Sequence, residues 1–135
     1  MYLLDTVVLS EIRKRQRDPA VVQWVTNQRD ADLFLSAVTI GEIERGIVLQ
    51  KNRNSPFSDE LSHWLDRILS LYSDRVLPVD IATARRWGRL SAEIGNDSPD
   101  LLIAATAMIH GLTVVTRNTR HFEPTGVAVL NPFSQ

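Results

Sequence analysis

The sequence predicts an α/β fold, a sandwich of helices around a mainly parallel sheet. Short apolar runs with β-branched residues alternate with segments of helical periodicity, and this alternation is typical of parallel sheets. The 135 residues are 44% hydrophobic and 23% charged, which is ordinary for a globular protein and excludes a disordered, collagen-like or coiled-coil chain. No long linker or internal repeat divides the sequence, so residues 1–135 are expected to form one domain.

Short apolar runs are predicted as the strands. They cover residues 2–8, 33–38, 75–79, 113–116 and 127–130. The first run is expected to pass from a buried strand into a helix, and its first polar residue is Asp5. Because proline cannot donate a backbone hydrogen bond, Pro78 places the third run at an edge of the sheet or at a strand end.

Capping residues indicate where the first helices begin. Asp18 before Pro19 is typical of a cap followed by the first helical residue. Thr39 with Glu42 three residues later matches a capping box, which places Glu42 in the first turn of its helix. Ser58 is expected to start the clearest amphipathic helix. Its apolar positions are Leu61, Trp64, Leu65, Ile68, Leu69 and Tyr72.

Two further helices are predicted in the second half of the chain. One covers residues 81–94 and ends at Gly95, a typical C-cap. The other opens with Ser98 as cap and Pro99 at the first helical position, with Asp100 in its first turn. Because residues 101–109 are apolar nearly all round, this helix must be buried.

Charge and cysteine content narrow the possible functions. The chain has 15 Lys and Arg against 16 Asp and Glu, a net charge of −1, so its composition gives no indication of a nucleic-acid partner. With no Cys there is no disulfide, thiol nucleophile or thiolate metal site. No run approaches the roughly 18 apolar residues of a membrane span, and Met1 leads directly into a strand-like segment instead of a signal peptide. A cytoplasmic protein without a membrane partner is therefore expected.

Three acidic residues interrupt apolar surroundings: Asp5, Glu42 and Asp100. In a parallel sheet, the end of the first strand and the starts of the following helices converge on one rim, where sites commonly form. Carboxylates gathered there would repel one another unless a cation neutralised them, and Mg²⁺ or Mn²⁺ prefers such oxygen ligands. This arrangement favours metal-assisted hydrolysis of a phosphodiester. Taken singly, Glu42 and Asp100 also suit a plain role as helix-dipole partners.

Other active sites fit the sequence less well. It contains no Gly-x-Ser-x-Gly elbow, and the span from Gly41 to Gly46 lacks the Lys-Ser/Thr that completes a phosphate loop. His63 and His110 are expected to be structural. A phosphoacceptor receiver domain stays open as an alternative, because Asp80 follows the third strand, although Asp5 has no acidic neighbour within its own strand.

Four segments resemble the motifs of PIN-domain ribonucleases, and most closely the VapC/FitB-like toxins of bacterial toxin–antitoxin pairs. They are residues 3–6 (Leu-Leu-Asp-Thr), 36–42, 99–107 and 113–118, and the resemblance runs from Met1 to Phe133. The resemblance implies a Rossmann-like three-layer fold and an RNA-cleaving enzyme. It also implies that Asp5, Glu42 and Asp100 bind Mg²⁺ or Mn²⁺, that a small antitoxin silences the protein and contacts DNA on its behalf, and that the chain forms a homodimer.

The sequence departs from these motifs at two places. Val7 stands where the first motif commonly has Asn, and Asn118 and His121 stand at the two places where a fourth acid occurs. Asn118 retains an amide oxygen and is assigned an assisting catalytic role. One negative charge fewer favours a single-metal mechanism or low activity. The alternative function is accordingly a catalytically weak or inactive module that binds an antitoxin and contributes to DNA-bound regulation.

Basic residues occur in groups despite the neutral total. Four of the five positions from Arg13 to Arg17 are basic, and other groups are Arg85, Arg86 and Arg89, and Arg117 and Arg120. A solvated surface explains them equally well. If they flank the acidic rim, they could follow an RNA backbone.

Overall fold

Five short strands form an all-parallel sheet at the centre of the molecule. The computed structural model describes residues 1–134. The strands are β1 (Tyr2–Leu4), β2 (Leu33–Ser36), β3 (Val76–Leu77), β4 (Thr113–Val115) and β5 (Val129–Leu130). Their order is β3-β2-β1-β4-β5, and every neighbouring pair is parallel. The predicted α/β architecture is confirmed, and β3, which Pro78 follows, lies at an edge as predicted.

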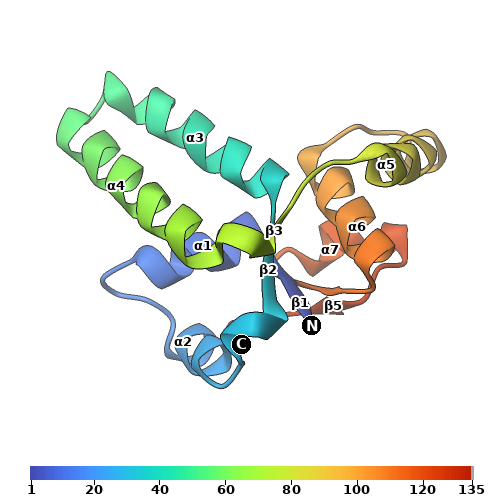
Figure 1. The fold of residues 1–135 in the computed structure, drawn as a ribbon, viewed down its shortest axis with the longest axis horizontal. Coiled ribbons are helices and arrows are strands. Elements are labelled where there is room, and N and C mark those ends of the chain that lie inside the picture. Colours follow the sequence, from blue (N-terminus) through green and yellow to red (C-terminus); the bar gives the residue numbers. More distant parts are fainter. Residues whose placement is uncertain (135) are drawn as a thin grey trace.

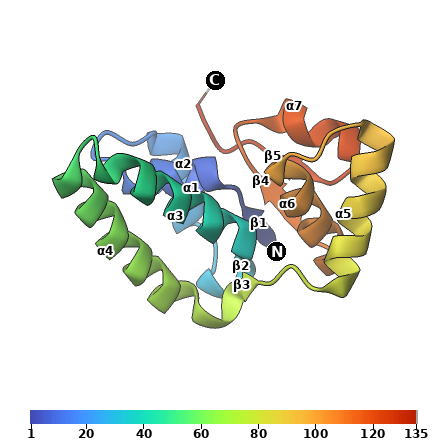
Figure 2. The same ribbon diagram turned by 90° about the horizontal axis from the view of Figure 1, so that it is seen from above.

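The helices stand in two groups on either side of the strands, and the ribbon is V-shaped (Figures 1 and 2). The first group contains α1 (Thr6–Arg13), α2 (Pro19–Thr26), α3 (Ala37–Lys51) and α4 (Ser55–Tyr72). The second contains α5 (Ile81–Ile94), α6 (Pro99–His110) and the short α7 (Thr119–Phe122). Single turns of 3-10 helix cover Asp30–Asp32, Ser73–Arg75 and Glu123–Thr125. We call the two groups the α3–α4 lobe and the α5–α6 lobe.

Each lobe has its own hydrophobic core because successive strand residues face opposite sides of the sheet. Leu4 and Val115 belong to the core of the α3–α4 lobe, whereas their neighbours Leu3 and Val114 belong to that of the α5–α6 lobe. All four side chains are fully buried. The sheet therefore separates two packed layers, and the ends of its strands lie where the two lobes meet.

Several boundaries differ from the predicted ones. Ser36, whose hydroxyl accepts from the Val38 N–H at 3.1 Å, is the N-cap of α3, so the predicted Thr39 capping box is wrong. Glu42 consequently lies in the second turn of α3 instead of the first. The chain enters α3 directly from β2, and Thr39 is buried inside the helix.

The predicted start of α4 is also wrong. The helix begins at Ser55, three residues before Ser58, and Asn54 caps it by accepting from the Phe57 N–H at 3.1 Å. Ser58 is instead buried and donates its hydroxyl to the Ile47 carbonyl at 2.9 Å, which ties α4 to α3. The helix α7 was not predicted. No helix within residues 1–134 has the length and apolar character needed to cross a membrane.

Candidate active site

Asp5 is a buried carboxylate at the carboxyl end of β1. Its backbone N–H donates to the Val115 carbonyl of β4 at 2.9 Å, which extends the pairing of the two strands by one residue. The side chain is only 4% exposed. Its Oδ1 accepts from the Thr6 N–H at 2.9 Å, and its Oδ2 accepts from the Thr116 hydroxyl at 2.8 Å. Asp5 thus caps α1 and is held by the end of β4.

The pKa of Asp5 is raised from 3.8 to about 6. Burial is the largest cause, because it disfavours the charged form. The hydrogen bonds from Thr116 and Thr6 act in the opposite direction and lower the pKa, whereas the charges of Asp100 and Glu42 raise it further. The three acids predicted to converge therefore lie close enough for two of them to disfavour ionisation of the third.

Glu11, the other buried carboxylate, shows the contrast. Its Oε2 accepts from the Asp18 backbone N–H at 2.9 Å, and its Oε1 accepts from the Lys14 ammonium at 3.0 Å. These contacts, the Asp18 bond first, lower the pKa of Glu11. Glu11 is a satisfied structural acid that joins α1 to its following connector, whereas Asp5 is a strained one that faces like charges.

Glu42 reaches the site from the second turn of α3. Its Oε1 accepts a 2.7 Å hydrogen bond from the Thr6 hydroxyl, and that hydroxyl also lies 3.2 Å from the Thr39 hydroxyl. Glu42 and Thr6 line a cavity of about 250 Å³ that continues along Gly46, Phe57 and Trp64. This cavity lies in the α3–α4 lobe.

Asp100 reaches the site from the first turn of α6, after the Ser98 cap and Pro99. Its Oδ2 lies 2.9 Å from Nδ1 of His121, on α7. Asp100 and His121 both line a separate cavity of about 450 Å³, in the α5–α6 lobe. Glu42 and Asp100 therefore open into different cavities on the two sides of the site.

Asn118 lies just beyond β4. Its backbone N–H donates to the Thr116 hydroxyl oxygen at 2.9 Å, and its carbonyl accepts from the His121 N–H at 3.0 Å. Its side chain is exposed and lines a shallow cavity together with Arg117, Arg120 and His121. Through its backbone, Asn118 links the residue that holds Asp5 to the residue that contacts Asp100.

The sequence analysis assigned no role to Thr6 or Thr116, and it did not predict the contact between His121 and Asp100. Thr6 and Thr116 were quoted as parts of motifs, but no contact was predicted for either. The available signal was their position: Thr6 directly follows Asp5 in the chain, and Thr116 directly follows β4, the strand that pairs with β1. The contact from His121 to Asp100 depends on α7, which was not predicted.

The donor set of Asp5, Glu42 and Asp100 suits a hard divalent cation in its chemistry. It consists of carboxylate oxygens, the preferred ligands of Mg²⁺ and Mn²⁺, and each oxygen has lone pairs beyond its present hydrogen bond. As the side chains are placed, residues 1–134 contain no group of three or more His, Cys, Asp or Glu side chains that could hold a metal ion. Glu42 contacts Thr6, and Asp100 contacts His121.

Comparison with known proteins gives a consistent result. A family model described as "PIN domain" matches residues 2–126. A VapC ribonuclease of Sinorhizobium fredii is 35% identical, with 98% of each chain covered, and the toxin FitB of Neisseria gonorrhoeae is 35% identical, with 98% of this chain and 99% of that one covered. The solved structure of FitAcB from Neisseria gonorrhoeae is similar, with a TM-score of 0.86 and 37% identity over 98% of each chain. The chain belongs to the PIN-domain family.

Proposed function

We propose that this protein is a metal-dependent endoribonuclease, the toxin of a toxin–antitoxin pair, and that the whole chain forms its single catalytic domain. The observation that carries the proposal is Asp5, a buried carboxylate whose pKa is raised to about 6 beside two further acids at the end of the central strand. Burial of repelling carboxylates costs stability, and a bound cation would offset that cost. Relatives over nearly the full length are named a ribonuclease and a toxin, which supports both halves of the proposal.

Asp5, Glu42 and Asp100 would hold Mg²⁺ or Mn²⁺. The ion would supply an activated water and neutralise charge on the phosphodiester. The chain's own residues then have distinct tasks. Thr116 and Thr6 keep both oxygens of Asp5 oriented, and Thr6 also holds Glu42. Asn118, which lines a cavity with His121, would assist at the phosphate.

The test is cleavage of total RNA by the purified protein with Mg²⁺ or Mn²⁺, with the cut ends mapped. We expect cleavage to stop on chelation and to fall at least 100-fold in Asp5→Asn, because electrostatic groups at a reaction centre contribute about 10²–10³ in rate. Circular dichroism shows whether the variant stays folded. Cleavage that persists undiminished after chelation would exclude the metal mechanism.

The proposed protein partners are a small antitoxin and a second copy of the chain, with DNA contacted only through the antitoxin. The basis is the motif resemblance together with the named toxin relative. Co-expression with the product of a small neighbouring reading frame should yield a stable complex that no longer cleaves RNA. Light scattering gives the stoichiometry of the complex and of the toxin alone.

A second candidate is a binding module without hydrolysis. It is favoured by Asn118 and His121 in place of a fourth acid, and by the occupation of Asp100 by His121. Calorimetric titration with Mn²⁺ separates the two candidates. A measurable affinity that disappears in Asp5→Asn supports the enzyme, and no affinity at the acidic cluster supports the module.

A further inference from the structure

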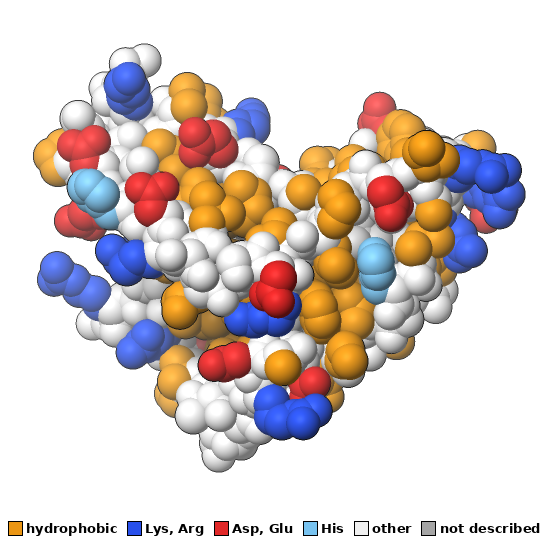
Figure 3. Space-filling model, in the orientation of Figure 1, with side chains coloured by type: hydrophobic (Ala, Val, Ile, Leu, Met, Phe, Trp, Pro, Cys, Tyr) orange, Lys and Arg blue, Asp and Glu red, His pale blue; other side chains and the backbone are white. Residues whose placement is uncertain are grey.

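A basic cavity of about 380 Å³ lies in the α3–α4 lobe, outside the acidic cluster. It is formed between the end of α1, the connector that follows it, and the outer face of α4. Its lining residues are Arg13, Arg15, Glu60, His63, Trp64 and Arg67. Figure 3 shows Lys and Arg side chains along the left edge of the molecule, over the place of the α1–α2 connector in Figure 1.

The arginines of this cavity form no ion pair within the described residues. The ion pairs within residues 1–134 involve Lys14, Arg29 and His121, so Arg13, Arg15 and Arg67 have no carboxylate within 4 Å. The guanidinium carbon of Arg13 lies 5.2 Å from the Phe57 ring centre and 6.0 Å from that of Trp64. Contact with aromatic faces orients this group without neutralising it.

The basic cavity adjoins the cavity that contains Glu42. Arg13 and Trp64 line it and also line the 250 Å³ cavity that contains Thr6 and Glu42. The two cavities therefore lie side by side along Arg13 and Trp64, and the smaller one is lined from Glu42 to these two residues. A ligand that occupies both must present anionic groups repeatedly along its length.

We propose that this cavity binds backbone phosphates of single-stranded RNA, a few nucleotides away from the phosphodiester at the acidic site. The inference rests on the proposed ribonuclease function and deepens it. A guanidinium group can donate two parallel hydrogen bonds to the oxygens of one phosphate, and a strand of RNA carries phosphates at regular intervals. An acidic peptide is the competing occupant, but the RNA strand alone explains why a basic cavity adjoins one that contains Glu42, a residue of the site proposed for phosphodiesters.

The test is the salt dependence of RNA binding, measured by fluorescence anisotropy with a labelled 20-nucleotide single strand. Both proteins compared carry Asp5→Asn, so that the strand is not cut. Each phosphate contact on a single strand adds about 0.7 to the slope of log K against log salt. Removing two contacts with Arg15→Gln and Arg67→Gln should lower the slope by about 1.4 and weaken binding at low salt at least several-fold.

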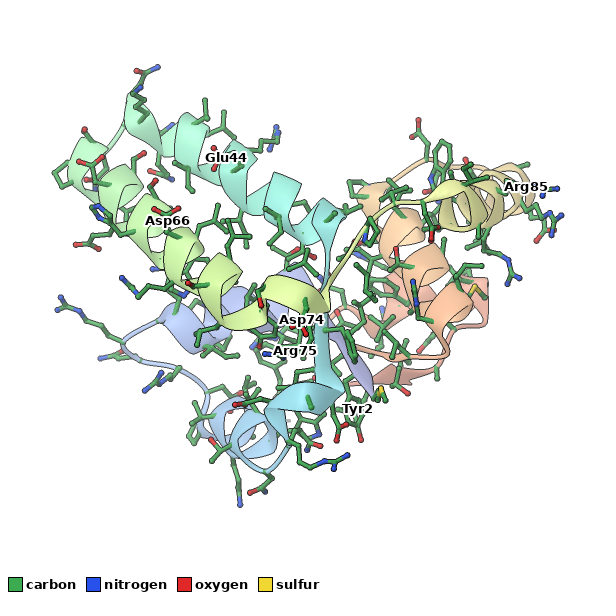
Figure 4. The ribbon with its side chains drawn as sticks, viewed as in Figure 1. Tyr2, Glu44, Asp66, Asp74, Arg75 and Arg85 are labelled. Atoms are coloured by element: carbon green, nitrogen blue, oxygen red, sulfur yellow. The ribbon has the colours of Figure 1, made fainter. Side chains whose placement is uncertain are left out.

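A matched control removes the same charge from the other lobe. Arg85 and Arg89 are exposed residues of α5, and Figure 4 shows Arg85 at the far edge of that lobe, directed away from the opening of the V. Arg85→Gln with Arg89→Gln should leave the slope unchanged. An equal fall in both double variants would overturn the proposal, because only net charge would then matter.

The outcomes separate this inference from the proposed function. If the Arg15→Gln, Arg67→Gln protein with an intact Asp5 cleaves RNA normally and the slope does not change, the cavity is not a phosphate site although the ribonuclease stands. If the unaltered protein neither binds nor cleaves RNA, the proposed function itself fails. If the variant loses affinity only for a labelled acidic peptide such as decaglutamate, the cavity is a peptide site and the proposal is overturned.

Discussion

The two lobes carry their acidic residues on very different supports. Asp100 stands at the start of α6, whose residues 101–107 are buried with the one exception of Leu102, and which packs tightly against α5. Glu42 stands on α3, which buries Thr39, Ile43 and Ile47 and leaves Val48 61% exposed. Asp100 therefore belongs to a helix that is buried in the core, whereas Glu42 belongs to a helical hairpin with one solvent-exposed face. Substitutions near Asp100 should mainly lower the free energy of unfolding. Substitutions near Glu42 should alter the site and change the free energy of unfolding little.

The largest expected effect is a cavity in the α5–α6 lobe. Ile103→Ala removes a fully buried side chain from α6 and should lower the free energy of unfolding by about 2–5 kcal/mol. Val48→Ala on the outer face of α3 should change it by about 0.5 kcal/mol or less. Urea denaturation monitored by circular dichroism measures both. A loss at Val48 as large as at Ile103 would mean that the open face of α3 is covered in solution.

The next effect is a pH dependence located at Asp5, between the two supports. Its pKa is higher in the folded protein (about 6) than in the unfolded chain (near 3.8), so the folded state binds the extra proton. The stability that this proton contributes is fully present below pH 3.8 and is lost as the pH rises through 6. This difference between the folded and unfolded pKa of Asp5 corresponds to about 3 kcal/mol in the free energy of unfolding.

Asp5→Asn tests this dependence because it removes the titration and keeps the shape. In the presence of chelator, the variant should unfold at higher urea than the unaltered protein at pH 8, and the two should converge near pH 4. A difference in stability between the two proteins that does not change between pH 4 and pH 8 would contradict the raised pKa. Mn²⁺ should stabilise only the unaltered protein, and more at pH 8 than at pH 5, because the cation binds the ionised carboxylate.

A smaller effect distinguishes the two threonines. Thr116→Val removes the hydroxyl that donates to Asp5, so it should raise the pKa of Asp5 further and cost about 1–2 kcal/mol of stability at pH 8. Cleavage should then decline more at pH 6 than at pH 8. Thr6→Val retains the backbone N–H to Asp5 and loses the hydroxyl contacts to Glu42 and Thr39, neither of which involves Asp5, so the pH profile should stay close to that of the unaltered protein. Identical profiles for both variants would refute the separate roles.

The smallest effect is expected at His121. The His121 side chain is 59% exposed, and exposed ion pairs contribute about 0–1 kcal/mol. His121→Gln should therefore leave the urea midpoint nearly unchanged. A larger loss would indicate that α7 depends on this contact to hold its place beside α6.

The features that the sequence predicted well are those set by neighbours in the chain. Pro19 after the Asp18 cap and the left-handed Gly95, with φ of 87°, start and end helices where they were expected. Such signals act through backbone geometry within a few residues. The Thr39 capping box failed because Ser36, three residues earlier, offered the same chemistry directly at the end of β2. Ser36 and Thr39 can both cap a helix, and the local sequence does not show which of them follows the end of the strand.

The candidate site likewise has features that the sequence predicts and features that only the fold decides. That Asp5, Glu42 and Asp100 are acids in apolar surroundings follows from residue type, and the expectation that they lie near one rim of the sheet follows from strand order. Their partners do not, because Thr116 lies 111 positions from Asp5 in the chain and contacts it only through the pairing of β1 with β4.

Thus the sequence by itself determined the parallel α/β architecture and the acids that face its rim, since periodicity and caps are local physical preferences. The folded chain was needed to show that Asp5 is buried with a raised pKa, that Glu42 and Asp100 belong to different lobes, and that unpaired arginines lie along one cavity. Burial, repulsion between carboxylates and the pairing of charges depend on distances through space, and those distances exist only after the two lobes have packed onto the sheet.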